Sequence, residues 1–274
     1  FEVNRIFDGL ISDPSKRDGE NTMLSKRFPG GRLSGIGANS PSSFRQVQAP
    51  IVMMDEIDAM SDSREGDPVT LAFKRADNYK DSIQILASTP TVKGESKIWD
   101  WLGKSDWRQW FVPSPHTGKH HVLDWSNLRW LKDQPETAVY TDPDTGGEWT
   151  EAMRHESVIA GEYRGTQDFK GIRGYHVNGM VSLFAPKKGY KSKYHQMSGE
   201  FLDAKHAGHE ELKTWTNTFL AKPWEDPALA QVEWEKVFDM REEWEPDLLP
   251  DGVLCLTFAA DVQQDRIEFE SWRH

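Results

Sequence analysis

Three short apolar runs in the first third of the chain predict β-strands: residues 32–37 (RLSGIG), 51–54 (IVMM) and 82–87 (SIQILA). Between the last two runs, apolar side chains recur at near-helical spacing in residues 68–79 (PVTLAFKRADNY). A strand, a helix and a second strand, with both strands apolar throughout, indicate a βαβ unit of a buried parallel sheet. The pattern therefore predicts an α/β fold, and the polar residues that end each strand lie where open α/β sheets bind ligands.

The pattern changes in the middle of the chain. Turn-forming residues crowd residues 113–150, in PSPHTG, KDQPET and TDPDTGG, and predict a small irregular or β-hairpin insert. Amphipathic spacing in residues 151–166 and 190–245 predicts helices. The segment PDLLPDG at 246–252 resembles a linker, and residues 253–272 predict a strand, a turn and a second strand.

Composition narrows the class of protein. The chain has 274 residues and a formal net charge of −11, which argues against a protein coated in nucleic-acid-binding surface. A local basic channel stays open as an alternative, because four lysines cluster in residues 187–193. No apolar run approaches the roughly 20 residues of a membrane-spanning helix, so we expect no membrane association. The single cysteine, Cys255, lies in an apolar run, and a buried thiol fits a reducing compartment such as cytoplasm.

The apolar run 51–54 leads directly into three acids, Asp55, Glu56 and Asp58. In nucleotide-hydrolysing P-loop enzymes, a buried strand ends in adjacent acids beside the triphosphate. The first carboxylate holds Mg²⁺, and a following glutamate takes a proton from the attacking water. If the strand continued, the Asp55 and Glu56 side chains would point to opposite faces of the sheet. The backbone must therefore turn here for both carboxylates to act at the same triphosphate. The alternative is a strand that ends at a solvated acidic turn, since short motifs carry false positives.

The next predicted strand ends in two hydroxyl residues, Ser88 and Thr89. Neighbouring strands of one parallel sheet would place these hydroxyls beside Asp55, where such groups sense whether the γ-phosphate is present. An ordinary Ser/Thr turn before Pro90 is the alternative.

The phosphate-binding loop G-x-x-x-x-G-K-[ST] is missing from the sequence. Gly103, Lys104 and Ser105 match its end, but Ile98 stands at the first glycine and a predicted helix precedes the match. Because the chain starts at Phe1 rather than a methionine and stops at His274 in or just after a strand-like run, we expect it to be part of a longer protein. The loop would then precede Phe1.

Five stretches, in order and over nearly the whole chain, resemble the large terminase subunit of tailed phages, in the lambda-like gpA family. They are NTMLSKRFPGGRLSGIGANSP (21–41), VMMDEIDAM (52–60), LASTPT (86–91), GYHVNGMVSLF (174–184) and NTFLAKPWE (217–225). Jointly the five stretches are specific, whereas no single one is.

This resemblance implies a P-loop NTPase-like (ASCE) fold, with a mostly parallel sheet flanked by helices and a second, RNase H-like nuclease domain. The expected parts are an ATPase core without its phosphate-binding loop (1–112), a zinc-ribbon-like hairpin insert without cysteines (113–150), a helical remainder with the linker (151–249) and the start of the nuclease (250–274). The implied function is an ATP-driven motor that packages double-stranded DNA into a procapsid, joined to an endonuclease that cuts concatemers. The implied partners are DNA, the small terminase subunit, the portal protein and further copies in a ring, in the host cytoplasm.

The resemblance also assigns roles to individual residues. Asp55 matches the Walker B magnesium ligand, Glu56 the catalytic glutamate, and Ser88 and Thr89 the coupling motif. Asp261 matches the first acid of the nuclease, which holds Mg²⁺ or Mn²⁺. The expected cofactors are ATP and Mg²⁺. Two-metal cleavage needs several convergent carboxylates, and the others would lie beyond the chain's end, so we expect the chain as given to be inactive as ATPase and nuclease.

One departure from the family concerns zinc. Relatives often carry Cys-Pro-His-Cys-Gly twice, whereas this chain has Ser-Pro-His-Thr-Gly at 114–118 and Asp-Pro-Asp-Thr-Gly at 142–146. A structural zinc site needs four nitrogen or sulfur ligands, so we expect no zinc and a hairpin that survives without metal. We expect His116, His120 and His121 to belong to a surface loop rather than to a metal site.

Two other classes of protein compete with this interpretation. Residues 55–58 and 87–89 mimic two motifs of a DExD-type helicase or translocase, but such an enzyme also needs Q-x-x-G-R-x-x-R downstream, which the sequence lacks. A catalytically dead prophage remnant that acts only as an assembly module is the non-enzymatic alternative. The reading frame upstream of Phe1 distinguishes this remnant from a motor. A glycine-rich loop ending in Lys-[ST] there supports a motor, and a stop codon supports a remnant.

Overall fold

The computed structural model describes residues 22, 24–37, 48–62 and 66–225, and the backbone of two further strands at 256–262 and 267–273. The chain divides into two compact units, Phe1–Glu225 and Asp226–His274. In the described part of the chain, no helix is both long and apolar enough to cross a membrane. Cys255 lies outside the described residues.

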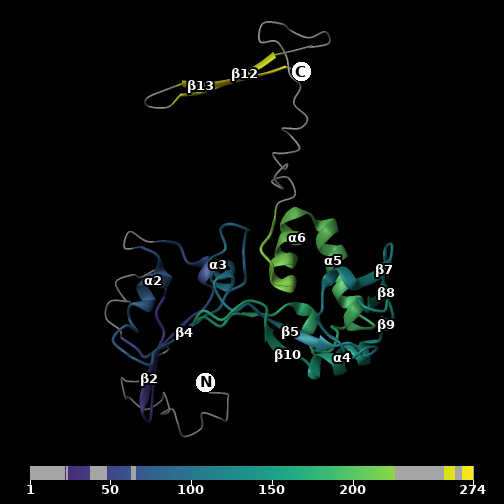
Figure 1. Ribbon diagram of the computed structural model, residues 1–274, viewed down its shortest axis with the longest axis horizontal. Helices are drawn as coiled ribbons and strands as arrows, with labels where there is room; N and C mark the ends of the chain where they lie inside the picture. Colours follow the sequence, from purple (N-terminus) through teal and green to yellow (C-terminus); the bar gives the residue numbers. More distant parts are fainter. Residues whose placement is uncertain are drawn as a thin grey trace. The chain divides into compact units, whose positions relative to one another are not determined.

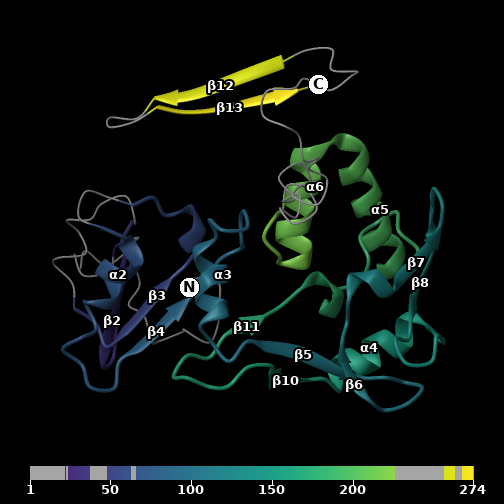
Figure 2. The ribbon, with the colours of Figure 1, turned by 45° about the horizontal axis from the view of Figure 1, so that its top comes forward.

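The predicted βαβ unit is present in the first compact unit (Figures 1 and 2). Strands β3 (Ile51–Met54) and β4 (Ile83–Leu86) pair in parallel, and α2 (Pro68–Phe73) lies between them in the sequence. The helix begins where the Asp67 carboxylate accepts a 2.9 Å hydrogen bond from the Thr70 N–H, with proline at the first helical position. It is shorter than predicted, because residues 74–78 form turns.

The described residues show one parallel strand pair of the predicted sheet but no buried, mostly parallel sheet. One face of the β3–β4 pair packs on α2, with Met54, Ile57 and Val69 buried. On the other face, Ile51, Met53, Ile83 and Ile85 are 43–70% exposed. Continuous apolar strands indicate burial on both faces, but the described residues supply a covering layer on one face only.

The apolar run at 32–37 also pairs differently from a strand of that sheet. Its strand is β2 (Gly31–Ser34), which forms an antiparallel hairpin with β1 (Ser25–Phe28). Most of the pairings between described strands are antiparallel. The described fold is therefore a mixed α/β arrangement of small sheets.

Residues 108–176 form two further small sheets. In the first sheet, strand β5 (Arg108–Pro113) pairs antiparallel with β6 and with β10, and it pairs parallel with β11. In the second sheet, β8 lies between β7 and β9. The bounds of these strands are β6 (His120–Val122), β7 (Leu128–Leu131), β8 (Gln134–Thr141), β9 (Glu148–Trp149), β10 (Glu162–Gly165) and β11 (Tyr175–His176). Residues 151–166, predicted as helix, thus divide into helix α4 (Glu151–Ile159) and strand β10.

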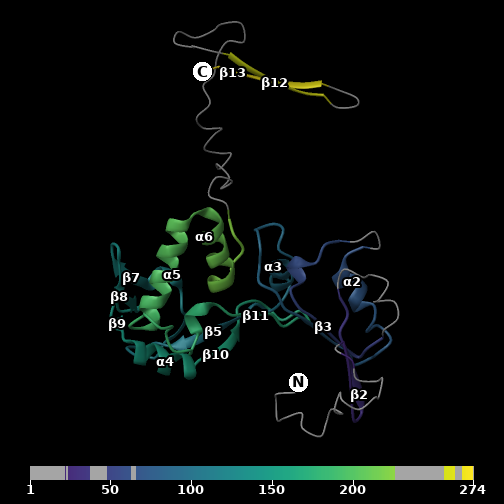
Figure 3. The same cartoon turned by 180° about the vertical axis from the view of Figure 1, so that it is seen from behind.

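Helix α5 (Lys193–Ala207) lies next to the second of these sheets, and α6 (His209–Trp215) lies beside α5 (Figures 1 and 3). The larger core lies beneath α5, where Tyr140, Trp149, Met180 and Met197 are almost fully buried. Side chains of Ser96, Thr150 and Ser192 cap the first turns of α3, α4 and α5. The helix bounds are α3 (Lys97–Gly103), α4 (Glu151–Ile159), α5 (Lys193–Ala207) and α6 (His209–Trp215), and a π-helical turn follows at Thr216–Leu220.

The second unit contains the predicted strand, turn and strand. Strands β12 (Leu256–Val262) and β13 (Ile267–Arg273) pair antiparallel, with Asp261 opposite Glu268. The prediction of two strands in residues 253–272 is therefore confirmed.

Candidate functional site

The chain turns sharply where β3 ends, at the predicted acid pair. Asp55 and Glu56 follow the strand directly, and Glu56 has φ 53° and ψ 48°, a left-handed conformation that is uncommon for residues other than glycine. The Glu56 N–H donates to Asp55 Oδ1 at 3.1 Å. After this turn, side chains no longer alternate between the two faces of the sheet, which the two acids need in order to act at one site. Both residues are exposed at the end of the strand.

The predicted hydroxyl pair lies at the same edge. Parallel pairing continues past the strands, since Ala87 N–H donates to Met54 O at 2.9 Å. The Ser88 hydroxyl lies 3.5 Å from Glu56 Oε2 and 3.1 Å from the Thr89 carbonyl oxygen, so these two acceptors share one donor. The structure therefore brings Asp55, Glu56 and Ser88 together, with Thr89 next in the same segment.

Asp58 is a residue of this edge that the sequence analysis left without a role. Its Oδ2 accepts hydrogen bonds from the Thr91 N–H and hydroxyl, both at 3.1 Å, and its Oδ1 accepts one from the Ile98 N–H at 2.7 Å. Its own N–H donates to the Ser88 Oγ at 3.2 Å. Asp58 thus ties the acid-bearing loop to the segment after β4 and to the start of α3. The third acid after the apolar run was the only sequence signal for it.

Lys97, in the first turn of α3, adds a positive charge nearby. Its Nζ lies 2.7 Å from Asp62 Oδ1 and 3.1 Å from Asp67 Oδ1, and it donates to the Met60 carbonyl oxygen. Burial acts to raise the pKa of Asp67, but hydrogen bonds from Thr70 and Lys97 outweigh it and lower that pKa. These contacts hold the end of the acid-bearing loop against α2 and α3.

The oxygen donors of this edge fit Mg²⁺ with a nucleotide. Magnesium is usually bound through one or two carboxylates together with substrate phosphates and water, rather than by an all-protein cage. The exposed Asp55 side chain is a carboxylate of this kind. Groups of three or more His, Cys, Asp and Glu residues suited to a metal are absent from the described residues.

The turns at 114–118 and 142–146, where the resemblance predicts a hairpin without metal, have the same internal hydrogen bonds. In the first, Ser114 Oγ accepts from the N–H groups of residues 116 and 117, both at 3.1 Å. In the second, Asp142 Oδ1 accepts from the N–H groups of residues 144 and 145, both at 3.0 Å. Each turn ends in a glycine with φ near +73°. The predicted turn geometry is therefore present.

The two turns face each other and are joined by the buried Asp142. Its Oδ2 accepts from the Ser114 hydroxyl at 2.5 Å and from the Trp149 indole N–H at 3.0 Å. Burial acts to raise the pKa of Asp142, but these bonds and those from the Thr145 and Asp144 amides hold it far below its usual range. The four positions 114, 117, 142 and 145 carry oxygen donors already engaged in hydrogen bonds, a set that does not fit structural zinc.

The histidines of this region are not all in a surface loop, contrary to the sequence prediction. His116 lies in the exposed first turn, but His120 and His121 lie in β6 and are partly buried. The His121 ring packs edge-on against Trp149 at 5.3 Å. Burial lowers the pKa of His121.

The lysine cluster at 187–193 does not form a continuous basic surface. Lys187 pairs with Glu200 at 2.7 Å, and Lys193 is buried with its Nζ 3.3 Å from Gln196 Oε1. Asp261, the predicted nuclease acid, lies in β12 in the second unit.

Comparison with known protein families gives two matches. The family described as phage terminase large subunit gpA, ATPase domain, matches residues 4–163, more than half of the chain. The family described as terminase large subunit gpA, endonuclease domain, matches residues 172–273. No curated protein and no solved structure matches the chain.

Proposed function

Because this chain belongs to the phage terminase large subunit gpA family, we propose that the edge formed by Asp55, Glu56 and Ser88 hydrolyses ATP to drive DNA into a procapsid. The observation that carries the proposal is the 3.5 Å approach of the Ser88 hydroxyl to Glu56 Oε2 at the ends of two parallel strands. An acid pair and a hydroxyl at one edge is the arrangement in which a phosphate-sensing group can contact the catalytic acid.

Each residue has a distinct task in this proposal. Asp55 would hold Mg²⁺, which when bound neutralises charge on the phosphate oxygens. The Glu56 carboxylate accepts the proton of the attacking water, and the left-handed turn at Glu56 directs it away from the strand. Ser88 shares its hydroxyl between Glu56 and a carbonyl oxygen, so a new acceptor at the site changes which partner it contacts.

The proposal extends to the second activity of the family. Asp261 in β12 would be the first acid that holds Mg²⁺ or Mn²⁺ for DNA cleavage. The endonuclease-domain match and the β12–β13 hairpin support this role. Cleavage by two metal ions needs further carboxylates that converge with Asp261.

The partners and the domain boundaries are part of the same proposal. Double-stranded DNA, the small terminase subunit, the portal protein and other copies in a ring would act with this chain in the host cytoplasm. The proposed parts are the ATPase core (1–112), the hairpin insert (113–150), the helical remainder with its linker (151–249) and the start of the nuclease (250–274).

The test compares Glu56→Gln with wild type in the protein expressed from its complete reading frame. Loss of the proton acceptor should lower DNA-stimulated ATP hydrolysis by roughly a hundredfold or more. Glu136→Gln, at an exposed position on β8, is the matched control and should hydrolyse ATP at the wild-type rate. Wild-type hydrolysis in Glu56→Gln would refute Glu56 as the catalytic base.

A further inference from the structure

Residues 221–225 are the last described residues of the first unit, and we name them the exit segment because the chain continues from them toward β12. The exit segment forms a parallel bridge with the segment after β4, through Val92 and Trp224. The Trp224 N–H donates to Thr91 O at 2.7 Å, and the Lys93 N–H donates to Trp224 O at 3.0 Å. The Lys93 Nζ also pairs with Glu225 at 2.9 Å.

The partner of the exit segment is the segment that carries the proposed phosphate-sensing hydroxyls. Thr91 lies three residues after Ser88 and is held by Asp58 through its N–H and its hydroxyl. Asp58 in turn lies two residues after Glu56 and donates its N–H to Ser88. An unbroken series of hydrogen bonds therefore runs from the acid-bearing loop through Thr91 to Trp224.

The exit segment is also held from its other side. The His176 Nε2 lies 2.9 Å from the carbonyl oxygen of Ala221, which has a left-handed φ of 51°. The Trp224 side chain is buried, and its indole packs edge-on against His209, the first residue of α6, at 5.1 Å. The exit segment thus has one defined conformation, set by contacts with β11, α6 and the segment after β4.

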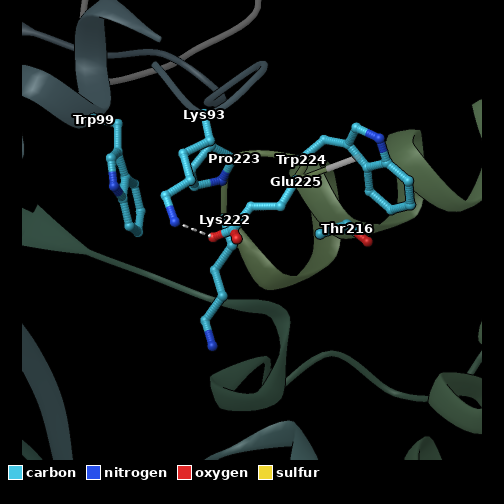
Figure 4. A pocket seen from close by; sticks show the side chains of 7 residues that line it. All are labelled: Lys93, Trp99, Thr216, Lys222, Pro223, Trp224 and Glu225. Atoms are coloured by element: carbon cyan, nitrogen blue, oxygen red, sulfur yellow. Dashed lines mark ion pairs between the residues drawn. The ribbon is translucent and has the colours of Figure 1, made fainter. Parts of the chain in front are cut away.

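A cavity of about 410 Å³ lies beside the exit segment. Figure 4 shows Trp99 facing the Lys93–Glu225 ion pair, while the Trp224 indole points away from that pair. Dense packing resists small displacements, whereas an open cavity leaves room for them. The cavity is lined by Lys93, Trp99, Thr216, Lys222, Pro223, Trp224 and Glu225.

We propose that the bridge between Val92 and Trp224 is a relay that passes a change at the nucleotide site to the exit segment, with Asp58 as its positioning residue. A shift of Ser88 is carried by Asp58 to Thr91, and the pairing of residues 91–93 with Trp224 carries it to the last residues of the first compact unit. The relay rests on the proposed ATPase function. It goes further by naming the exit segment as the part of the chain that responds to a change at the nucleotide site.

The primary experiment measures amide hydrogen exchange in the protein expressed from its complete reading frame, with Mg²⁺ and a non-hydrolysable ATP analogue or without nucleotide. The analogue should change the exchange of the peptide that contains residues 222–225 by roughly threefold or more, as a shifted local opening equilibrium requires. A protein that hydrolyses ATP without this change would overturn the relay alone. A protein that neither binds nor hydrolyses ATP would overturn the proposed function and the relay with it.

Lys93→Pro and Lys93→Ala separate the backbone bridge from the ion pair. Both substitutions remove the contact with Glu225, but only proline removes the N–H that donates to Trp224. The turn tolerates proline, because Gly94 has φ 86° and Glu95 N–H donates to Val92 O at 3.1 Å. These are features of a type II turn, whose second position favours proline. The exchange response should persist in Lys93→Ala and fall by at least half in Lys93→Pro, and equal responses would overturn the relay.

Thr91→Val and Thr91→Ser test the positioning role of Asp58. Valine keeps the shape and the backbone bridge but loses the hydroxyl that donates to Asp58, whereas serine keeps a hydroxyl. The nucleotide response of residues 222–225 should fall by at least half in Thr91→Val, which keeps only the N–H bond to Asp58, and should be retained in Thr91→Ser. A full response in the valine variant, or none in the serine variant, would contradict a positioning role.

Discussion

The Ser114 hydroxyl donates a 2.5 Å hydrogen bond to Asp142 Oδ2, and this bond joins two turns whose first residues are 28 positions apart. Each turn also closes on itself through a bond from its glycine N–H to its first carbonyl oxygen. A buried carboxylate with several hydrogen-bond donors therefore joins the two turns. Three predictions follow from the chemistry of this site and one from the edge beside β3.

Asp142→Asn should destabilise the protein. The substitution removes a buried charge that accepts hydrogen bonds from Ser114, Trp149 and two backbone amides. Hydrogen bonds to charged groups contribute about 1.5–3 kcal/mol, so the free energy of unfolding should fall by about that amount. Urea unfolding at neutral pH measures it. Asp144→Asn, in the same turn but more exposed, should change stability by less than about 1 kcal/mol, and equal losses would contradict the importance of burial.

The stability that Asp142 contributes should depend on pH in a defined direction. Its folded-state pKa is lowered, so the unfolded state binds the proton more readily. The contribution is therefore complete above the unfolded pKa of about 3.9 and is lost as pH falls below that value toward the folded pKa. Unfolding free energies measured from pH 6 down to pH 3 should fall less steeply in Asp142→Asn than in wild type. Parallel curves would argue that Asp142 is not the group responsible.

Four cysteines at positions 114, 117, 142 and 145 should create a zinc site. The two turns already have matching hydrogen bonds and face each other, and structural zinc accepts four thiolates. The variant with Ser114→Cys, Thr117→Cys, Asp142→Cys and Thr145→Cys should bind one Zn²⁺ and melt at a higher temperature with zinc than with a chelator. A variant that keeps Asp142 and has three cysteines serves as control. Failure of the four-cysteine variant to bind zinc would show that the turns do not converge.

Ser88→Ala should slow ATP hydrolysis in the protein expressed from its complete reading frame. The substitution removes the hydroxyl beside Glu56 Oε2, and one hydrogen bond lost from the transition state corresponds to about a tenfold fall in kcat. Ser61→Ala, at an exposed position in the same loop, is the control. A fall in ATP affinity with unchanged kcat would indicate that Ser88 binds nucleotide without coupling it to hydrolysis.

The local features of this chain could be read from its sequence. Apolar runs at 51–54 and 82–87 predicted β3 and β4, and the acids after the first run required the turn that occurs at Glu56. Proline and glycine at fixed positions predicted the turns at 114–118 and 142–146. These features depend on side-chain alternation and backbone preferences within a few residues, which a sequence pattern contains.

The sequence by itself thus determined the strand ends, the turns and the chemistry of the acid pair. Only the tertiary structure decided that one face of β3 and β4 is exposed, that Asp58 holds Thr91, and that Trp224 pairs with the segment after β4. Each of these is a contact between segments far apart in the chain or, among the described residues, a strand face that no other segment covers. The alternation of apolar and polar residues indicates which side chains favour burial. Which other residues cover or contact those side chains depends on the packing of the whole unit.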